Sequence, residues 1–162
     1  GFEEKAPLFG AAAEYAYRTY GLTPVFVAVE KHLDPGAGQL AARGLTIPHY
    51  FLDDAGGAGT IIGALSRMQA VVSMRLHALI FAAGQGIPLA GVVYDPKVSA
   101  FLRYIGQEQF VDLAELTGQN LCAMMDQCVA QAAHPEAQAA AVRNLQAMEQ
   151  KNVEVARRLL KG

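Results

Sequence analysis

Residues 69–84 read QAVVSMRLHALIFAAG, and this stretch decides the fold class. A short apolar run ends at Ser73, Arg75 and His77 follow at once, and an apolar segment then runs to Gly84. This pattern is typical of a buried strand followed directly by a helix. In a parallel α/β layer such a junction lies at the carboxyl edge of the sheet, where free N–H groups at a helix amino-terminus attract anions. The stretch therefore predicts a small anion site.

Segments of the same kind alternate along the chain. Largely apolar runs predict strands at residues 24–30, 47–52, 69–73 and 88–94, and a shorter edge strand at 110–113. Helical spacing predicts helices at residues 8–20, 34–43, 74–84 and 96–104, one through residue 68, and long helices from 113 to 132 and from 135 to the end. Such alternation through short loops is typical of a parallel sheet with helices on both faces. We therefore expect an α/β fold with a doubly wound, Rossmann-like parallel sheet and long C-terminal helices.

Prolines mark three of the predicted helix boundaries. Asp34 and Asp95 each precede a proline, which is the pattern of an N-cap followed by proline at the first helical position. His134 also precedes a proline, and a residue in that position is pushed out of helical geometry. We therefore expect the C-terminal region to be broken into two helices there.

Length and composition indicate one soluble domain over residues 1–162. The chain is 52% hydrophobic with a formal net charge of -2, so it lacks the clustered Lys and Arg that a nucleic-acid surface needs. Cys122 and Cys128 lie six residues apart in a helical segment, where their side chains diverge, so we expect no disulfide and a reducing compartment. No apolar run reaches the ~20 residues of a membrane span. We expect a cytoplasmic protein, which leaves room for a place at the cytoplasmic face of a membrane.

Polar residues follow the predicted strands at one edge of the sheet. The strands end at Glu30, Leu52, Ser73 and Tyr94, and parallel topology brings the loops after them together. The candidate site residues in this region are Lys31, His32, Asp53, Asp54, Ser73, Arg75, His77, Asp95 and Lys97.

Arg75 and His77 are the strongest of these candidates. The planar guanidinium of an arginine binds two oxygens of a carboxylate or phosphate, and a histidine can transfer a proton near neutral pH. Residues two apart on a helix point in nearly opposite directions, so both can serve one ligand only if Arg75 lies in the turn before the helix. We expect that arrangement.

Structural explanations compete with these functional ones. Arg75 could pair with Asp95 or Asp53, and His77 could be a buried histidine bonded to a carbonyl group. His49, inside a predicted strand, fits a core or edge histidine better than a ligand. The glycine-rich loop at residues 53–63 lacks the acidic residue about 20 positions on that a dinucleotide site needs, which favours an active-site loop or a linker. The sequence has no strong metal-ligand spacing, no nucleophile elbow and no catalytic triad order.

Two motifs resemble those of a known family. MRLHALIFA at residues 74–82 is followed by GIP at residues 86–88 and YDPKV at residues 94–98. This combination is similar to the carboxyl-terminal half of polysaccharide pyruvyltransferases, above all to the bacterial branch that modifies cell-wall polysaccharide. The resemblance covers residues 69–104.

The resemblance implies the carboxyl-terminal half of a B-type glycosyltransferase-like architecture. Phosphoenolpyruvate would be the donor substrate, with no cofactor, and a pyruvate ketal would form on a polysaccharide or lipid-linked saccharide. Arg75 would hold the anionic groups of the donor, Leu76 would contribute a backbone or apolar contact, and His77 would act as general acid or stabilise the departing phosphate. The other residues implied in substrate binding are Ser73, Tyr94, Asp95 and Lys97.

The acceptor-binding half of such an enzyme would lie upstream of these residues. We therefore expect the chain alone to be incomplete and inactive, and we leave open whether it forms a homo-oligomer. Two alternatives remain from the sequence: a nucleotide-sugar-binding domain of a B-type glycosyltransferase, or a non-catalytic domain that assembles through its long final helix.

Overall fold

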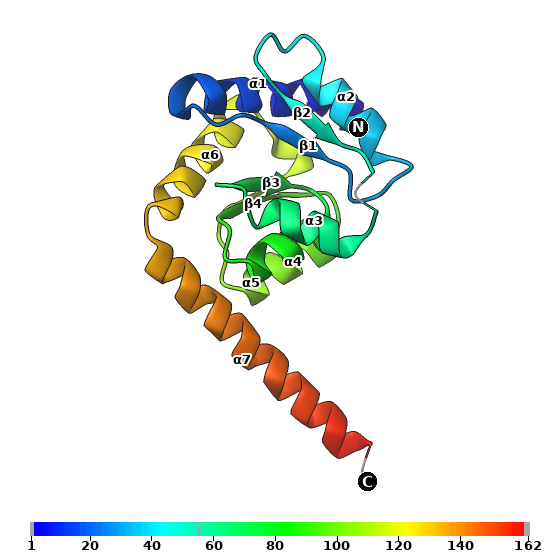
Figure 1. Cartoon of the computed structure of the whole chain (residues 1–162), viewed down its shortest axis with the longest axis vertical. Helices are drawn as coiled ribbons and strands as arrows, with labels where there is room; N and C mark the ends of the chain where they lie inside the picture. The colour runs from blue at the N-terminus through cyan, green and yellow to red at the C-terminus, as the bar shows by residue number, and fades with distance from the viewer. Residues whose placement is uncertain (1, 55, 161–162) are drawn as a thin grey trace.

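Parallel strands alternate with helices in a computed structural model that describes residues 2–54 and 56–160 (Figure 1). The strands are β1 (Val25–Val27), β2 (Tyr50–Leu52), β3 (Val71–Ser73), β4 (Leu89–Val93) and β5 (Phe110–Asp112). The helices are α1 (Phe2–Tyr20), α2 (Asp34–Ala42), α3 (Ala58–Leu65), α4 (Leu76–Gly84), α5 (Pro96–Tyr104), η1 (Leu113–Glu115), α6 (Gly118–Ala132) and α7 (Pro135–Leu159). The predicted α/β alternation and the long C-terminal helices are confirmed.

The strands form two parallel sheets. β1 pairs with β2, and β3, β4 and β5 pair in that order, with β5 at an edge as predicted. Every pair is parallel, but β1 and β3 belong to different sheets where one continuous sheet was expected. The strands are also shorter than the apolar runs in the sequence, because the ends of those runs lie in loops and bends beside the strands.

The β3–β4–β5 sheet holds the packed core of the molecule. All five residues of β4 are buried, and they alternate between two clusters. Leu89 and Val93 pack with the buried side chains of α3, α4 and α5, whereas Ala90 and Val92 pack with those of α1 and α6. This sheet therefore has helices on both faces, which explains why β4 has no polar residue.

Helix α1 lies across the top of the molecule in Figure 1, beside α2 and α6. It begins at Phe2, earlier than the predicted residue 8, and ends at Tyr20, just before Gly21, whose φ of 69° suits glycine. α1 and α2 approach closely at Gly10, where a Cβ atom would collide with the carbonyl oxygen of Ala41. Gly10 therefore allows the two helices to pack against each other.

The C-terminal region departs from the prediction at its start. A short 3-10 helix follows β5, and α6 begins only at Gly118, where Thr117 and Asn120 form a reciprocal capping box. The predicted continuous helix from residue 113 was wrong, because this side-chain cap starts a new helix. The predicted break at His134 is confirmed.

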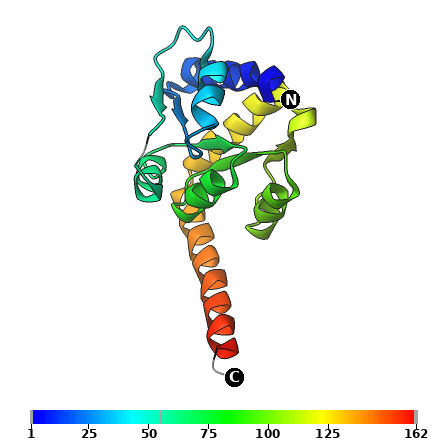
Figure 2. The ribbon, with the colours of Figure 1, turned by 90° about the vertical axis from the view of Figure 1, so that its right-hand side faces the viewer.

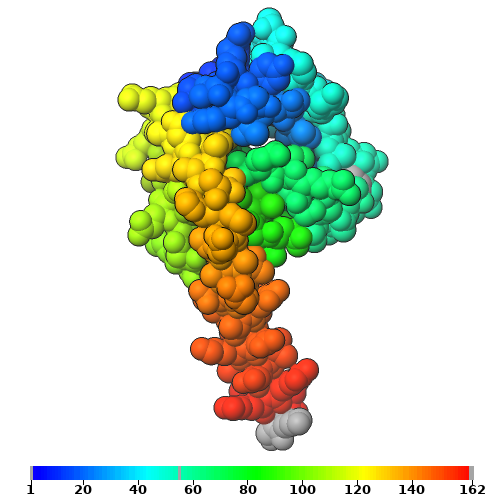
Figure 3. Space-filling model, turned by 60° about the vertical axis from the view of Figure 1, so that its left-hand side comes forward, coloured from blue at the N-terminus to red at the C-terminus, as the bar shows by residue number. Residues whose placement is uncertain are grey.

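The last helix, α7, extends well beyond the rest of the molecule (Figures 2 and 3). Its first half rests on α4 and α6, with Val142 against Gly86, and all described residues after Met148 are exposed. Within the described residues, no helix has the length and apolar character to cross a membrane. Cys122 and Cys128 are both free thiols, as predicted.

Candidate functional site

Arg75 occupies the turn between β3 and α4. It is the N-cap residue of α4, with an extended backbone at φ -86° and ψ 119°, so it lies outside the helix as predicted. Its backbone N–H donates to Ser73 Oγ at 3.0 Å, which closes a tight turn at the end of the strand. This turn directs the Arg75 side chain away from the helix axis and toward the carboxyl end of β1.

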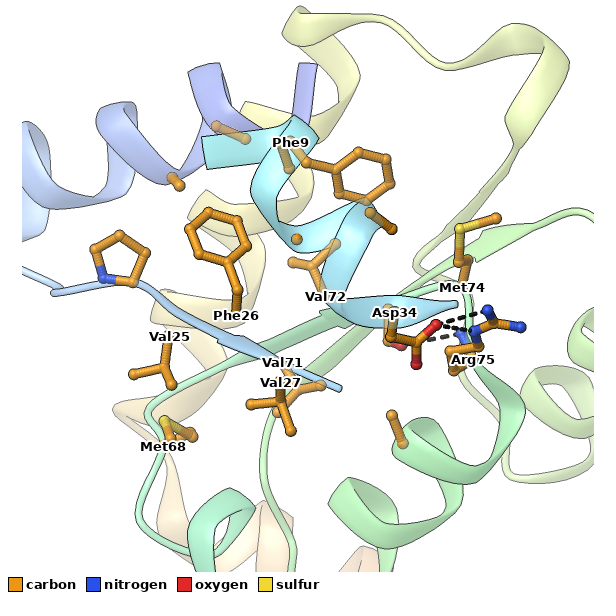
Figure 4. Close-up of a pocket in the computed structure, with 18 of the residues that line it drawn as sticks. Phe9, Val25, Phe26, Val27, Asp34, Met68, Val71, Val72, Met74 and Arg75 are labelled. Carbon is orange, nitrogen blue, oxygen red and sulfur yellow. Dashed lines mark hydrogen bonds and ion pairs between the residues drawn. The ribbon is translucent and has the colours of Figure 1, made fainter. Parts of the chain in front are cut away.

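Asp34 holds the guanidinium of Arg75 there (Figure 4). Arg75 Nε and Nη2 both donate to Asp34 Oδ1, at 2.8 and 2.6 Å. The other oxygen, Oδ2, accepts the backbone N–H groups of Val29 and Glu30 at 3.0 and 2.8 Å. Asp34 was predicted to cap α2, but Leu33 occupies that position, since the carboxylate turns instead to the end of β1 and to Arg75. One nearly buried side chain therefore joins β1, α2 and the β3–α4 turn.

The charge of Arg75 is well supported in this setting. Burial by itself lowers the pKa of Arg75, but the hydrogen bond and charge of Asp34, with a smaller contribution from Tyr94, outweigh burial and raise it above the ordinary value. Arg75 is two-thirds covered by its neighbours, with 32% of its side chain exposed. Arg75 therefore stays charged at the strand edge, where the Asp34 carboxylate balances its charge.

His77 lies at the start of α4 and is exposed. Its ring lies 6.4 Å from that of Phe81, and it lines a cavity of about 220 Å³ together with Lys31, Gly57 and Ala58. Exposure rules out the alternative of a buried histidine. The imidazole is available to a ligand between the loop before α3 and the first turn of α4.

Arg75 lines a different and larger cavity, of about 450 Å³. Asp34, Ser73 and Tyr94 line the same cavity. The large and the small cavity share Ala28 and Val29 in their walls, so they are neighbours at the end of β1. Arg75 and His77 thus lie on adjacent hollows at one edge of the fold.

A search with sequence models of protein families matched residues 13–96 to the family described as polysaccharide pyruvyl transferase. The match covers more than half of the chain and includes the β3–α4 turn and Tyr94. The chain belongs to the polysaccharide pyruvyl transferase family. Searches of curated proteins and of solved structures found no significant match.

The other candidate residues of this pyruvyl transferase family member lie at the start of α5, in α4, and in the loops after β1 and β2. Asp95 caps α5 as predicted, accepting the N–H of Lys97 at 2.9 Å and pairing with Lys97 Nζ at 3.3 Å. That backbone hydrogen bond is the main cause of the lowered pKa of Asp95. Leu76 packs on the core cluster around α4. Asp95 and Lys97 pair with each other, and neither residue lines the large or the small cavity.

The loops after β1 and β2 contribute a second ion pair. Lys31 Nζ lies 2.8 Å from Asp54 Oδ1, and this contact is the main cause of the lowered pKa of Asp54. His32 is exposed and gives its backbone N–H to the Glu30 carboxylate, whereas Asp53 lines the large cavity. The loops therefore converge at this edge, but they line two cavities. Lys31 lines the small cavity with His77, and Asp53 lines the large cavity with Arg75.

Asp34 is the candidate site residue that sequence reasoning missed. The sequence placed it at a helix start, and the structural alternative for Arg75 was a pair with Asp95 or Asp53, whereas the structure pairs Arg75 with Asp34. The available signal was its position just after a strand end, which puts it on the same edge as Arg75. His49 is a half-buried residue whose Nδ1 lies 2.8 Å from the carbonyl oxygen of Ile47. Within residues 2–54 and 56–160, no cluster of His, Cys, Asp and Glu could hold a metal ion.

Proposed function

We propose that this chain binds phosphoenolpyruvate as the donor for forming a pyruvate ketal on a saccharide of a cell-wall polysaccharide. The observation that carries the proposal is the placement of Arg75 outside α4 and of exposed His77 just inside it, on neighbouring cavities. Membership of the family supports the reaction class.

Phosphoenolpyruvate has two anionic ends, a carboxylate and a phosphate, and each cavity is lined by one basic side chain that an aspartate pairs, Arg75 with Asp34 and Lys31 with Asp54. Arg75, oriented by Asp34, receives the carboxylate at the edge of the large cavity. His77 and Lys31 receive the phosphate at the small cavity, where Lys31 exchanges its exposed partner Asp54 for the ligand. The amino-terminus of α3 borders the same cavity through Gly57 and Ala58 and adds favourable N–H groups.

The proposed reaction needs one proton at carbon and the loss of phosphate. Protonation of the methylene carbon makes the adjacent carbon electrophilic, so that one saccharide hydroxyl adds to it, the C–O bond to phosphate breaks, and a second hydroxyl adds. Of the two hydroxyl protons released, one replaces the proton given to carbon and the other leaves on the phosphate as hydrogen phosphate. His77 is the residue in place to donate the proton or to hydrogen-bond the leaving phosphate. Arg75 keeps the carboxylate, and hence the reacting carbon, in one orientation.

Isothermal titration calorimetry with phosphoenolpyruvate tests the binding step. Arg75→Ala is expected to weaken binding by about 10- to 100-fold, because it removes charge-assisted hydrogen bonds worth about 1.5–3 kcal/mol. The matched control is Arg18→Ala, which removes an exposed arginine paired with Glu14 on α1 and should leave binding unchanged. Equal binding by wild type and Arg75→Ala, or tighter binding of uridine diphosphate than of phosphoenolpyruvate, would refute the proposal.

A further inference from the structure

The two sheets face each other across the large cavity, edge to edge. Its two long walls are residues 24–29, which contain β1, and residues 69–74, which contain β3. Figure 4 shows Val25 and Val27 on one strand and Val71 and Val72 on the other, with α1 and α2 above them. The hollow is therefore a slot between two strands that lie in separate sheets.

Backbone groups of both strands point into this slot. Ala28 N–H donates to Leu52 and Tyr50 N–H donates to the carbonyl of Pro24, so the even-numbered residues of β1 face β2. In a parallel ladder alternate residues face opposite neighbours, so the N–H and C=O groups of Val25 and Val27 face the slot.

The same reasoning applies to β3. Val71 N–H donates to the carbonyl of Pro88, so the backbone N–H and C=O groups of Val71 face β4. Val72 therefore presents its N–H and C=O groups to the slot from the opposite side. Two rows of strand donors and acceptors thus confront each other, and such groups are strongly selected to find partners when they are away from water.

The slot has the length and lining of a strand position. Six residues on each wall correspond to about 20 Å at 3.3 Å per residue, the usual length of a strand. Phe9 and Ala12 of α1 line it on one side, and Leu65 and Met68 line it on the other. The charged residues Asp34, Asp53 and Arg75 belong to the carboxyl end of the slot, because they follow or contact the strand ends there. An occupant would thus have apolar side chains on both faces.

Asp34 also defines the relative direction of the two walls. Its carboxylate binds the N–H groups that follow β1 and the guanidinium that follows β3, so the carboxyl ends of β1 and β3 meet at one end of the slot. β1 and β3 therefore run in the same direction, and a strand that continues the all-parallel pairing of both sheets would run in that direction too.

We propose that the slot binds an extended, apolar polypeptide strand from outside residues 2–160, parallel to β1 and β3. The strand joins the two sheets into one of order β2–β1–strand–β3–β4–β5, which is the 3-2-1-4-5-6 order of doubly wound folds. A peptide strand, unlike an apolar small molecule, offers N–H and C=O groups to both walls. The inference rests on the slot alone and does not depend on donor binding.

Amide hydrogen exchange measured by NMR tests this proposal. The probe is a synthetic peptide of about five alternating valine and leucine residues with lysines at both ends for solubility, the length of a typical strand. Without peptide, the amides of Val25, Val27 and Val72 should exchange fast, whereas the paired amide of Val71 should be protected. With peptide, those three amides should slow at least tenfold, and the amide of Val71 should change little.

Two controls make the test decisive. The same peptide N-methylated at its central residue keeps its side chains but loses a backbone donor, and it should protect the three amides far less. Equal protection by the methylated peptide, or no protection by either peptide, overturns the proposal. So does slow exchange at Val27 and Val72 before any peptide is added, which means the walls already bond to each other. Protection by dodecanoate instead of the peptide identifies a fatty-acid-like occupant and also overturns it.

Discussion

The two sheets of the molecule are packed very differently. β4, at the centre of the three-stranded sheet, is buried along its whole length between helices on both faces. β1 is only half-buried, and Tyr50 and Phe51 of β2 are 64% and 40% exposed. Aromatic contacts hold the smaller sheet together, with the rings of Phe26 and Phe51 stacked 5.4 Å apart. The half of the molecule around the β3–β4–β5 sheet therefore has a buried core on both faces of its sheet, whereas the half around the β1–β2 sheet is more exposed.

The candidate site lies where these halves meet. Arg75 and His77 come from the β3–α4 junction of the well-packed half, whereas Asp34 is the first residue of α2 and Lys31 lies in the loop before α2, both in the other half. The hydrogen bonds of Asp34 are thus both part of the site and a tie between the halves. A site of this kind is sensitive to how the two halves are placed, because its charged groups come from both.

The largest effect is expected in the core of the well-packed half. Leu79 is fully buried in the cluster of α3, α4 and α5, so Leu79→Ala should lower the free energy of unfolding by about 2–5 kcal/mol. The matched control is Ile80→Ala, the next residue of α4, which is 36% exposed and should cost much less. Urea denaturation measures both. Similar losses for the two variants would contradict the packing described for this half.

The order of elements was predictable because each depends on local signals. β4 reads as an uninterrupted apolar run, Asp95 with the following proline marks the start of α5, and His134 marks the break before α7. The separation of β1 from β3 was not predictable, since apolar periodicity shows that a strand is buried but not which strand it pairs with. The late start of α6 was missed because Thr117 and Asn120 cap it through side chains.

The site was predictable in position and less so in its contacts. The rule that loops converge at the carboxyl edge placed Arg75, His77 and Tyr94 in one region, and the turn position of Arg75 followed from the need to face a ligand. The pairing of Arg75 with Asp34, 41 residues away, depends on how the two halves are placed. No local pattern specifies that placement.

The second prediction concerns the tie at the site. Asp34→Asn should lower the free energy of unfolding by about 1.5–3 kcal/mol, because hydrogen bonds to a charged partner are lost at a mostly covered position. Glu14→Gln removes an exposed pair within α1 and should cost at most about 0.5 kcal/mol. Urea denaturation compares them. Equal costs would mean that Asp34 does not join the halves.

The smallest effect concerns a second tie, between α1 and α6. Tyr15 and Tyr20 both donate to Asp126 Oδ1, at 2.8 and 2.6 Å, and these hydrogen bonds are the main reason why the pKa of each phenol is raised. A raised pKa in the folded state means that the contribution to stability is complete below the unfolded value of about 10 and is lost as the pH rises through the folded value.

Two of the six tyrosines should therefore ionise later in the folded protein than in the denatured protein. Ultraviolet absorbance of tyrosinate, followed during an alkaline titration of both states, measures this delay. Asp126→Asn should abolish most of it, because the acceptor loses its charge. A delay that persists in Asp126→Asn would show that burial, and not the carboxylate, suppresses ionisation. The two hydrogen bonds would then join α1 to α6 without the charge of Asp126 being the cause of the raised pKa.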